Sequence, residues 1–149
     1  MIEIGHGPGG LTAALLDAGA PRLVAVERDA GCVEALQSTG LVEEAAGRLR
    51  LVHDDARRVG LGALCDEEGI ADTGTVKVVG NLPFSVGTRL LVDWLYPLDT
   101  RLGSFTLLFQ VRADSKATAI RHCLTAFHRI RATVRLPLRR RLPSGYARG

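Results

Sequence analysis

The segment Asn81-Leu82-Pro83-Phe84 carries groups that could do chemistry on a planar amine. It follows the apolar run at residues 75–80, so Asn81 stands where a buried strand ends, a costly place for an amide that has no task. Pro83 disfavours the helical region for Leu82 and thereby fixes where the Leu82 carbonyl points. The Asn81 side-chain oxygen and that carbonyl could accept both hydrogens of one exocyclic amine, while Phe84 offers a ring face for stacking a base.

This arrangement suits methylation of a nucleobase amine. Two acceptors restrain the amine while its lone pair, otherwise delocalised into the ring, turns towards an electrophilic methyl group. Because the amine loses its proton readily once alkylated, no strong general base is needed. Catalysis would then rest on positioning and electrostatic stabilisation.

A glycine loop near the start of the sequence predicts a cofactor site. The apolar run 2–4 breaks into Gly-His-Gly-Pro-Gly-Gly at 5–10, and helical spacing follows. Glycines let a backbone turn sharply and approach a ligand, and the helix N-terminus beyond offers free N–H groups. The loop alone leaves open a plain tight turn, a nicotinamide or flavin site, or another nucleotide-like cofactor.

Acidic residues follow the next two predicted strands. The run 22–26 ends at Glu27, 22 residues after Gly5, and the run 48–52 leads into His53, Asp54 and Asp55. Open α/β sheets bind ligands at the carboxyl ends of their strands, although two such aspartates could merely cap a turn. Glu27 suits any cofactor with ribose hydroxyls. The segment that begins at Asn81 discriminates, because a dehydrogenase has no need of it.

The patterns along residues 1–110 alternate between strand and helix. A first helix is predicted to bury Leu11, Ala14, Leu15 and Ala18. A second, capped by Asp29, should bury Cys32, Val33 and Leu36. A later helix, capped by Ser85 or Thr88, should bury Leu90, Leu91, Trp94 and Leu95. Strands are predicted at 2–4, 22–26, 48–52, 75–80 and 104–110, and an Arg-rich helix is predicted from the spacing of Ile120, Leu124, Phe127, Ile130 and Val134. Five strands separated by helical segments predict an α/β fold, a doubly wound and mostly parallel sheet with right-handed crossovers.

The composition is that of a soluble globular domain with an uneven charge. Hydrophobic residues make up 46% and charged residues 23% of the 149 residues, and no apolar run reaches the roughly 18 residues that a membrane span needs. The three cysteines and four histidines form no metal-ligand pattern, so we expect no metal and reduced, intracellular thiols. Residues 112–149 hold ten of the 19 Lys and Arg and one acid, a net charge of +9 against −6 for the rest. An acidic body with a basic tail is expected.

Four segments resemble, in order and spacing, the ribosomal RNA adenine N6-dimethyltransferase family: residues 2–12, 24–29, 53–56 and 80–85. The stretch 80–95 is the most telling, and it is most similar to the mitochondrial type (dimethyladenosine transferase 1, also called mitochondrial transcription factor B1). The resemblance covers about residues 1–111 and implies a Rossmann-like class I methyltransferase core.

What the resemblance implies is S-adenosylmethionine-dependent methylation, and dimethylation, of adenine N6 in small-subunit ribosomal RNA. The enzyme would be mitochondrial, a monomer and without a membrane partner. The target adenine would have to be unpaired or flipped, because its N6 is inaccessible inside a paired stack.

The resemblance also assigns roles to individual residues. Asn81, Leu82, Pro83 and Phe84 would hold the target adenine. The methionyl end of the donor would lie against the glycine loop, Glu27 would accept hydrogen bonds from the ribose hydroxyls, and Asp55 would contact the adenine amine. The full set of donor-binding residues would be Glu3, Gly5, Gly7, Gly9, Glu27, Arg28, Asp55, Ala56 and Asn81.

The sequence also departs from the family. Members carry a segment before the first strand, and after Phe-Gln they continue with a Lys-Glu-containing helix, further strands and a helical RNA-binding domain. Here Phe109-Gln110 runs into Val-Arg-Ala-Asp-Ser-Lys, and the resemblance ends after Lys116. We therefore expect an incomplete core at 1–111, truncated at both ends, and a basic tail at 112–149 that is unlike the family and disordered.

Two hypotheses follow from these departures. The sequence could be a fragment or a mispredicted gene product read in a shifted frame after Lys116, which transcript sequencing across codons 108–120 would test. As an alternative function, the chain could be an inactive or RNA-binding, transcription-associated remnant of the same fold.

Overall fold

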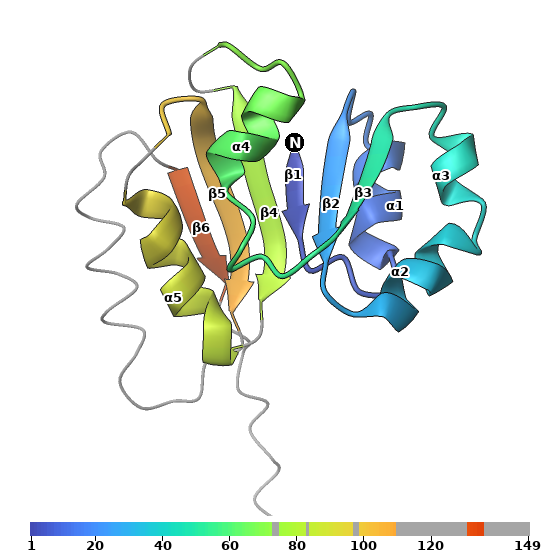
Figure 1. Cartoon of the computed structure of the whole chain (residues 1–149), viewed down its shortest axis with the longest axis horizontal. Helices are drawn as coiled ribbons and strands as arrows, with labels where there is room; N and C mark the ends of the chain where they lie inside the picture. The colour runs from blue at the N-terminus through green and yellow to red at the C-terminus, as the bar shows by residue number, and fades with distance from the viewer. Residues whose placement is uncertain (73–74, 83, 97–98, 110–130, 136–149) are drawn as a thin grey trace, which may run out of the picture.

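The fold is built on a parallel sheet with helices on both faces (Figure 1). The computed structural model describes residues 1–72, 75–82, 84–96, 99–109 and 131–135. The strands are β1 (Ile2–Ile4), β2 (Leu23–Glu27), β3 (Leu49–His53), β4 (Val76–Leu82), β5 (Leu102–Phe109) and β6 (Arg131–Arg135). The helices are α1 (Gly10–Asp17), α2 (Ala30–Gln37), α3 (Leu41–Glu44), α4 (Leu61–Glu67) and α5 (Phe84–Leu95).

The strand order is β3-β2-β1-β4-β5-β6, and every neighbouring pair is parallel. All the carboxyl ends therefore lie along one edge, the lower one in Figure 1. The chain leaves β1 towards β2 and later returns to place β4 on the other side of β1, so the topological switch lies between β1 and β4. Ligands of doubly wound sheets bind at the carboxyl ends beside such a switch.

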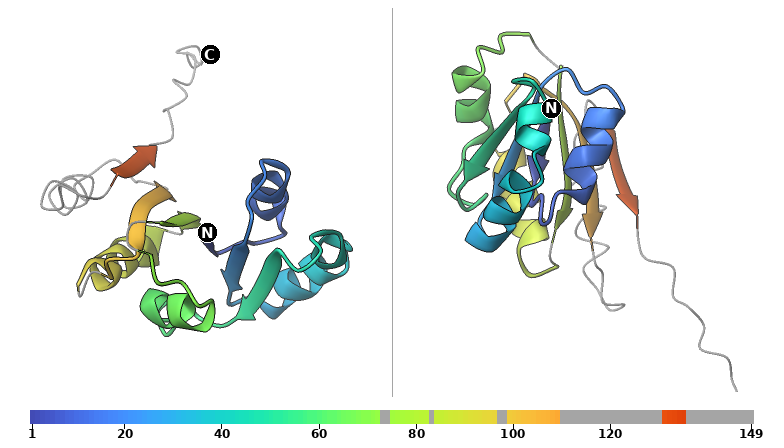
Figure 2. Two further views of the ribbon diagram at one scale, coloured as in Figure 1. Left: turned by 90° about the horizontal axis from the view of Figure 1, so that it is seen from above. Right: turned by 90° about the vertical axis from the view of Figure 1, so that its right-hand side faces the viewer.

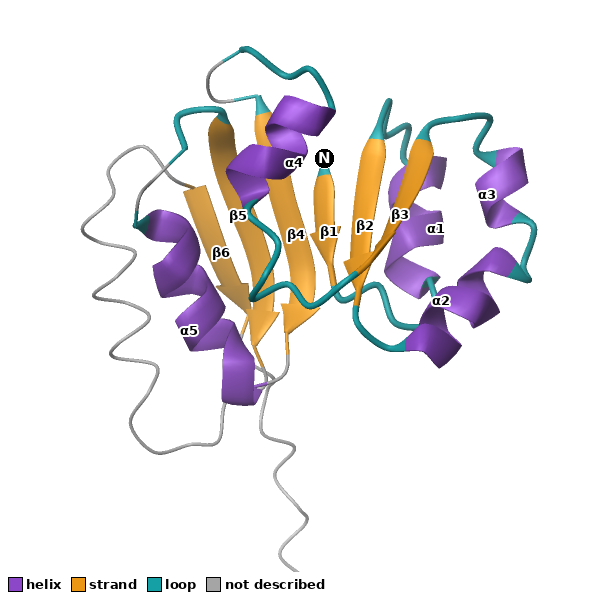
Figure 3. Ribbon diagram, viewed as in Figure 1, coloured by secondary structure: helices purple, strands orange, loops and turns teal. Residues whose placement is uncertain are grey.

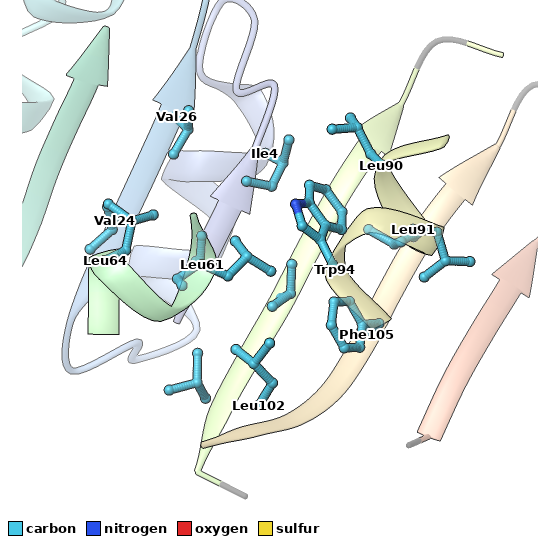
Figure 4. Packing of buried hydrophobic residues seen from close by; sticks show 14 of the residues in the cluster. Ile4, Val24, Val26, Leu61, Leu64, Leu90, Leu91, Trp94, Leu102 and Phe105 are labelled. Carbon is cyan, nitrogen blue, oxygen red and sulfur yellow. The ribbon is translucent and has the colours of Figure 1, made fainter. Parts of the chain in front are cut away.

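Helices α1, α2 and α3 cover one face of the sheet, and α4 and α5 cover the other (Figure 2). The larger core lies under α4 and α5, where Ile4, Val26 and Phe105 of the strands meet Leu61 and Trp94 of the helices (Figure 4). The rings of Trp94 and Phe105 stack with their centroids 6.3 Å apart. The smaller core, on the opposite face, comprises Leu16, Leu23, Ala25, Ala45 and Leu49. The larger core contains apolar residues of both β1 and β4, so it packs the two strands that flank the switch. No helix among the described residues is long and apolar enough to cross a bilayer.

Most predicted elements are present. The doubly wound parallel sheet and the first five strands are confirmed, and so is the burial of Leu90, Leu91, Trp94 and Leu95 on α5. Asp29 caps α2 as predicted, because its Oδ1 accepts a hydrogen bond from the Cys32 main-chain N–H at 2.9 Å. Val33 and Leu36 are buried, whereas Cys32 is only partly buried.

The predicted buried face of α1 is wrong. Leu11 is 41% exposed, and the buried residues of this helix are Thr12 and Leu16. The reason is a polar pair: the Thr12 hydroxyl donates to Glu3 Oε2 at 2.8 Å beneath the helix. A prediction from hydrophobic spacing does not count a threonine as a buried residue. It therefore placed the buried face of the helix one residue away, on the side that begins at Leu11.

The predicted start of α5 is also wrong. The helix begins at Phe84, directly after the β4 segment, so Ser85 and Thr88 lie inside it and cannot be its N-caps. Strand β4 extends to Leu82, two residues beyond the predicted end at residue 80, so Asn81 and Leu82 belong to the strand and not to a loop after it.

The third difference concerns the predicted Arg-rich helix. Residues 131–135 form β6, in register with Ser104–Leu108 of β5, so Ile130 is followed by a strand and Val134 lies in one. Parallel pairing satisfies main-chain groups that β5 would otherwise leave open at a sheet edge. The rest of the predicted helix lies outside the described residues. The sheet thus has six strands where five were predicted, and one comes from the predicted tail.

Candidate active site

A cavity of about 350 Å³ lies at the carboxyl ends of β1, β2 and β4, a size typical of small-molecule sites. The connection from β3 to α4 runs along this edge of the sheet (Figure 3). The cavity is lined by Ile4, Gly5, Val26, Glu27, Arg28, Asp54, Asp55, Ala56, Arg57, Asn81, Leu82 and Val86. A larger hollow of about 440 Å³ lies between α4 and α5, but it contains none of the strand-end carboxylates. The strand-end carboxylates are therefore in the smaller cavity.

The glycine loop shapes the cavity mainly through its backbone. Gly5, Gly7 and Gly9 have φ values of 72°, 53° and 92°, which glycine adopts without strain. Of the three, only Gly5 lines the cavity, and a Cβ there would lie 3.9 Å from the Asn81 carbonyl oxygen. The Gly7 N–H donates to Glu27 Oε2 at 3.0 Å, and a Cβ on Gly9 would overlap Leu36 Cδ1 of α2. A Cβ would thus be in ordinary van der Waals contact at Gly5, in open space at Gly7 and in overlap with Leu36 at Gly9.

Glu27, at the end of β2, is a carboxylate held by main-chain N–H groups. Its Oε1 accepts from Arg28 N at 2.7 Å and from Asp29 N at 2.9 Å, and its Oε2 accepts from Gly7 N at 3.0 Å. Partial burial alone would raise the pKa of Glu27, but these three hydrogen bonds outweigh it and lower the pKa. Because each carboxylate oxygen can accept two hydrogen bonds, Oε2 keeps one free position that a ribose hydroxyl could use.

Asp55, after β3, is held by Arg57. The Arg57 Nε lies 3.0 Å from both carboxylate oxygens of Asp55, and Nη2 lies 2.5 Å from Oδ2. This fork holds the pKa of Asp55 well below its ordinary range. Asp54 Oδ1 accepts from Asp55 N at 2.7 Å, and Asp55 Oδ1 accepts from Arg57 N at 2.9 Å. Both aspartates therefore cap the turn, and Asp55 also faces the cavity.

Asn81 and Leu82 bring the predicted amine acceptors to the same cavity. Both residues line it from β4, with Asn81 exposed and Leu82 buried. Their position across from Gly5 is the switch between β1 and β4. Pro83 lies outside the described residues, and so does the side chain of Phe84, so their roles stay predictions.

Glu3 of β1 and His6 of the glycine loop are buried and do not line the cavity. Glu3 is fully buried on the α1 side of the sheet and does not line the cavity, so its assignment to the donor stays a prediction. Burial raises the pKa of Glu3. His6 is 4% exposed and its Nδ1 donates to the Gly7 carbonyl at 2.7 Å. Within the described part of the chain, Glu3 Oε1 and His6 Nε2 are buried without a hydrogen-bond partner.

Comparison with known proteins decides the family. The sequence profile of the family described as ribosomal RNA adenine dimethylase matches residues 1–135. This chain belongs to that family. The match extends past Lys116, so the expectation that the likeness to the ribosomal RNA adenine dimethylases ends there is wrong.

Individual members of the family align with the same part of the chain. The ribosomal RNA small subunit methyltransferase A of Rhizobium meliloti (strain 1021) is 46% identical over 112 residues, which are 74% of this chain and 38% of the relative. The protein of the same name from Rhizobium etli (strain CIAT 652) is 41% identical over 121 residues, 80% of this chain and 41% of the relative. The chain thus spans about two fifths of the length of these relatives.

Among solved structures, a dimethyladenosine transferase from Plasmodium falciparum matches with a TM-score of 0.54 at 21% identity, over 73% of this chain and 34% of that one. This likeness shows the methyltransferase fold. The two sequence relatives are bacterial, so they give no support to the predicted mitochondrial type and location.

The structure adds cavity residues that the sequence predictions for this chain did not include. Ile4 is the last residue of β1, Val26 is the last but one of β2, and Val86 lies in the first turn of α5. Arg57 follows Asp55 at a spacing that a turn brings together, and this spacing is a signal that could have indicated the pair. Asp54 was noted beside Asp55 but was not assigned to the donor.

Proposed function

We propose that this chain binds S-adenosylmethionine and methylates the N6 amine of adenines in small-subunit ribosomal RNA, adding two methyl groups. Family membership supports the reaction. The observation that carries the proposal is one cavity that joins Glu27 and Asp55, suited to a nucleoside donor, with Asn81 and Leu82, suited to a target amine.

The residues present fit the donor. S-adenosylmethionine, when bound, supplies an electrophilic methyl group on a positively charged sulfonium. Glu27 offers one free acceptor for a ribose hydroxyl, and Asp55 faces the cavity as a carboxylate that can accept from an adenine amine. Gly5 lines the cavity without a side chain, which leaves room there for the methionyl part. Three carboxylates (Glu27, Asp54 and Asp55) against two arginines (Arg28 and Arg57) leave the cavity lining with a net charge of −1, which favours a cationic donor.

The acceptor side of the cavity works by positioning. The Asn81 amide oxygen and the Leu82 carbonyl hold the two hydrogens of the target amine, and Phe84 stacks on the base. The lowered pKa values of Glu27 and Asp55 keep both as carboxylates at neutral pH, which makes them weak proton acceptors. The amine therefore releases its proton to water after alkylation, and rate acceleration comes from orientation.

Other parts of the proposal rest on resemblance and charge. The donor and target site belongs to a core at residues 1–111, and the basic residues at 112–149 contact RNA. The protein acts as a monomer. Mitochondrial placement stays a prediction from the motif resemblance alone.

Two measurements test the proposed function in order. Calorimetry with S-adenosylmethionine should show binding, and labelled methyl transfer to small-subunit ribosomal RNA should follow. Asn81→Ala should lower the transfer rate at saturating donor by about 10²–10³-fold, the usual cost of losing one transition-state hydrogen bond of this type. Absence of both donor binding and transfer would sink the enzyme proposal, and RNA binding without donor binding would favour the non-catalytic remnant.

A further inference from the structure

We propose that Arg57 is a positioning residue for recognition of the donor's adenine, acting through Asp55. The inference rests on the proposed donor site. It concerns how the Asp55 carboxylate is held so that a single acceptor position is left for a ligand amine.

The contacts between the two residues are a side-on fork closed by the main chain. Arg57 Nε lies 3.0 Å from Asp55 Oδ1 and 3.0 Å from Oδ2, and Nη2 lies 2.5 Å from Oδ2. The Arg57 main-chain N–H donates to Oδ1 at 2.9 Å. A single residue therefore holds this carboxylate through both its side chain and its main chain, and fork geometry fixes the carboxylate plane.

One acceptor position of the Asp55 carboxylate remains for a ligand. An ionised carboxylate has about four in-plane positions, two on each oxygen. The Arg57 main-chain N–H takes one position on Oδ1, Nη2 takes one on Oδ2, and the Nε–H, 3.0 Å from both oxygens, is shared between them. Arg28 Nη1 lies 3.9 Å from Oδ2, beyond hydrogen-bond distance, so it does not take the last one. Three N–H groups thus face four positions, and with respect to the described residues one acceptor position is left on the Asp55 carboxylate at the cavity wall.

This arrangement gives the site a chemical preference. Arg57 keeps Asp55 ionised, so the free position can only accept a hydrogen bond. An adenine amine can donate to it, whereas a carbonyl oxygen at the same place, as in hypoxanthine, would meet a carboxylate oxygen and be repelled. Arg57 thus sharpens the choice of an amino-purine donor through the Asp55 carboxylate that it holds.

A rival role for Arg57 makes the opposite prediction. If the guanidinium occupied the place of the amine, a donor would have to displace it, and removing Arg57 would tighten binding. The two roles are separated by the direction of a single change in affinity.

The experiment is a double-mutant cycle on the full chain, with calorimetry of S-adenosylhomocysteine and of its inosine analogue, in which a carbonyl replaces the amine. Arg57→Ala should weaken S-adenosylhomocysteine binding by roughly tenfold, the worth of one hydrogen bond to a charged group. The ratio of the two affinities, for S-adenosylhomocysteine over its inosine analogue, should fall by the same factor. Arg57→Lys should restore little, because a lysine cannot form the fork. In the Asp55→Asn background, Arg57→Ala should have no further effect.

The control is Arg58→Ala, on the neighbouring arginine, which lines the second hollow and should leave both affinities unchanged. Tighter binding in Arg57→Ala, full rescue by lysine, or an equal loss in the Asp55→Asn background would overturn the inference while leaving the donor site standing. Failure of the unmodified chain to bind S-adenosylhomocysteine would overturn the donor site and the inference together.

Discussion

Three acidic side chains show how local contacts decide the role of a residue type. Glu27 and Asp55 end strands at the cavity, where main-chain N–H groups and Arg57 lower their pKa values. Glu3, on the neighbouring strand β1, is fully buried, and burial raises its pKa. Its carboxylate accepts a single hydrogen bond, from the Thr12 hydroxyl. The first two are suited to hold a polar ligand, and the third joins β1 to α1.

Glu27→Gln should destabilise the fold. A neutral amide cannot accept three main-chain N–H bonds, and we expect a loss of about 1–2 kcal/mol in the free energy of unfolding at pH 7. Because the pKa of Glu27 is lowered, its contribution is complete above its ordinary value of 4.5 and is lost as the pH falls further. Urea denaturation at pH 7 and pH 4 measures both effects. Glu34→Gln, on the exposed side of α2, is the control, and an equal loss there would count against the N–H network.

Glu3→Gln should have the opposite sign. The raised pKa means that ionised Glu3 opposes folding, so stability falls as the pH rises from 4.5 through the folded-state pKa. The glutamine keeps an acceptor for Thr12 without the charge. We expect a gain of up to about 1 kcal/mol at pH 7 that vanishes near pH 4, measured by urea denaturation. Unchanged donor affinity should accompany it, and a loss of donor binding would show that Glu3 contacts the donor after all.

Several site residues could be predicted because each sits at a strand end with a recognisable neighbour. Gly5, Glu27, Asp55 and Asn81 follow or close apolar runs, and parallel strands bring such ends together. Glu3 could not be placed in the same way. Glu3 precedes the glycine loop, but the alternation of side chains along β1 turns it to the α1 face of the sheet. Its burial there is explained by the hydrogen bond from Thr12, which was not predicted.

At the scale of elements, the glycine loop sets how closely α1 and α2 approach. Gly9 precedes α1 in the left-handed region, and a Cβ there would overlap Leu36 of α2. Gly10 begins the helix, and a Cβ at that position would have no heavy atom within 4 Å. Gly9 is therefore required by both its backbone conformation and its packing, whereas neither constraint applies to Gly10.

Gly9→Ala should therefore cost about 1–3 kcal/mol of unfolding free energy through strain and overlap. Gly10→Ala should raise stability by about 0.5–1 kcal/mol, because alanine loses less backbone entropy in a helix. Thermal or urea denaturation of the two variants side by side is the measurement. Equal effects from the two substitutions would contradict the packing described for Gly9.

Element types were predictable where side-chain periodicity matched burial, as on α5, where Trp94 and its apolar neighbours pack on Phe105. Prediction failed where tertiary pairing decided the outcome. Thr12 is buried because its hydroxyl donates a hydrogen bond to the buried Glu3 carboxylate. Residues 131–135 form a strand because they pair with the edge of β5. Neither partner is close in sequence, so a local pattern carries no signal for it.

At the scale of the whole molecule, the strand order and the charge distribution both indicate two regions, one suited to the donor and one suited to RNA. The switch between β1 and β4 gathers acidic and amide groups at one edge of the sheet, and the sequence beyond residue 111 carries the excess of arginine. A cationic donor suits the first region, and a polyanion suits the second. Binding of RNA should then depend on salt in a way that binding of the donor does not.

The consecutive arginines Arg139, Arg140 and Arg141 allow a direct test of that division. Each phosphate contact on single-stranded RNA contributes about 0.7 to the slope of log affinity against log salt. Replacing all three with glutamine should lower the magnitude of that slope by up to about 2 and weaken RNA binding most at low salt. Fluorescence anisotropy with a labelled ribosomal RNA fragment across a salt series measures it. Donor affinity of the same variant, by calorimetry, is the internal control and should not change, because the donor cavity is formed by residues between Ile4 and Val86. An unchanged salt slope would mean that the arginine run does not contact the phosphates, and the proposed division between an acidic donor region and a basic RNA-binding region would then have to be abandoned.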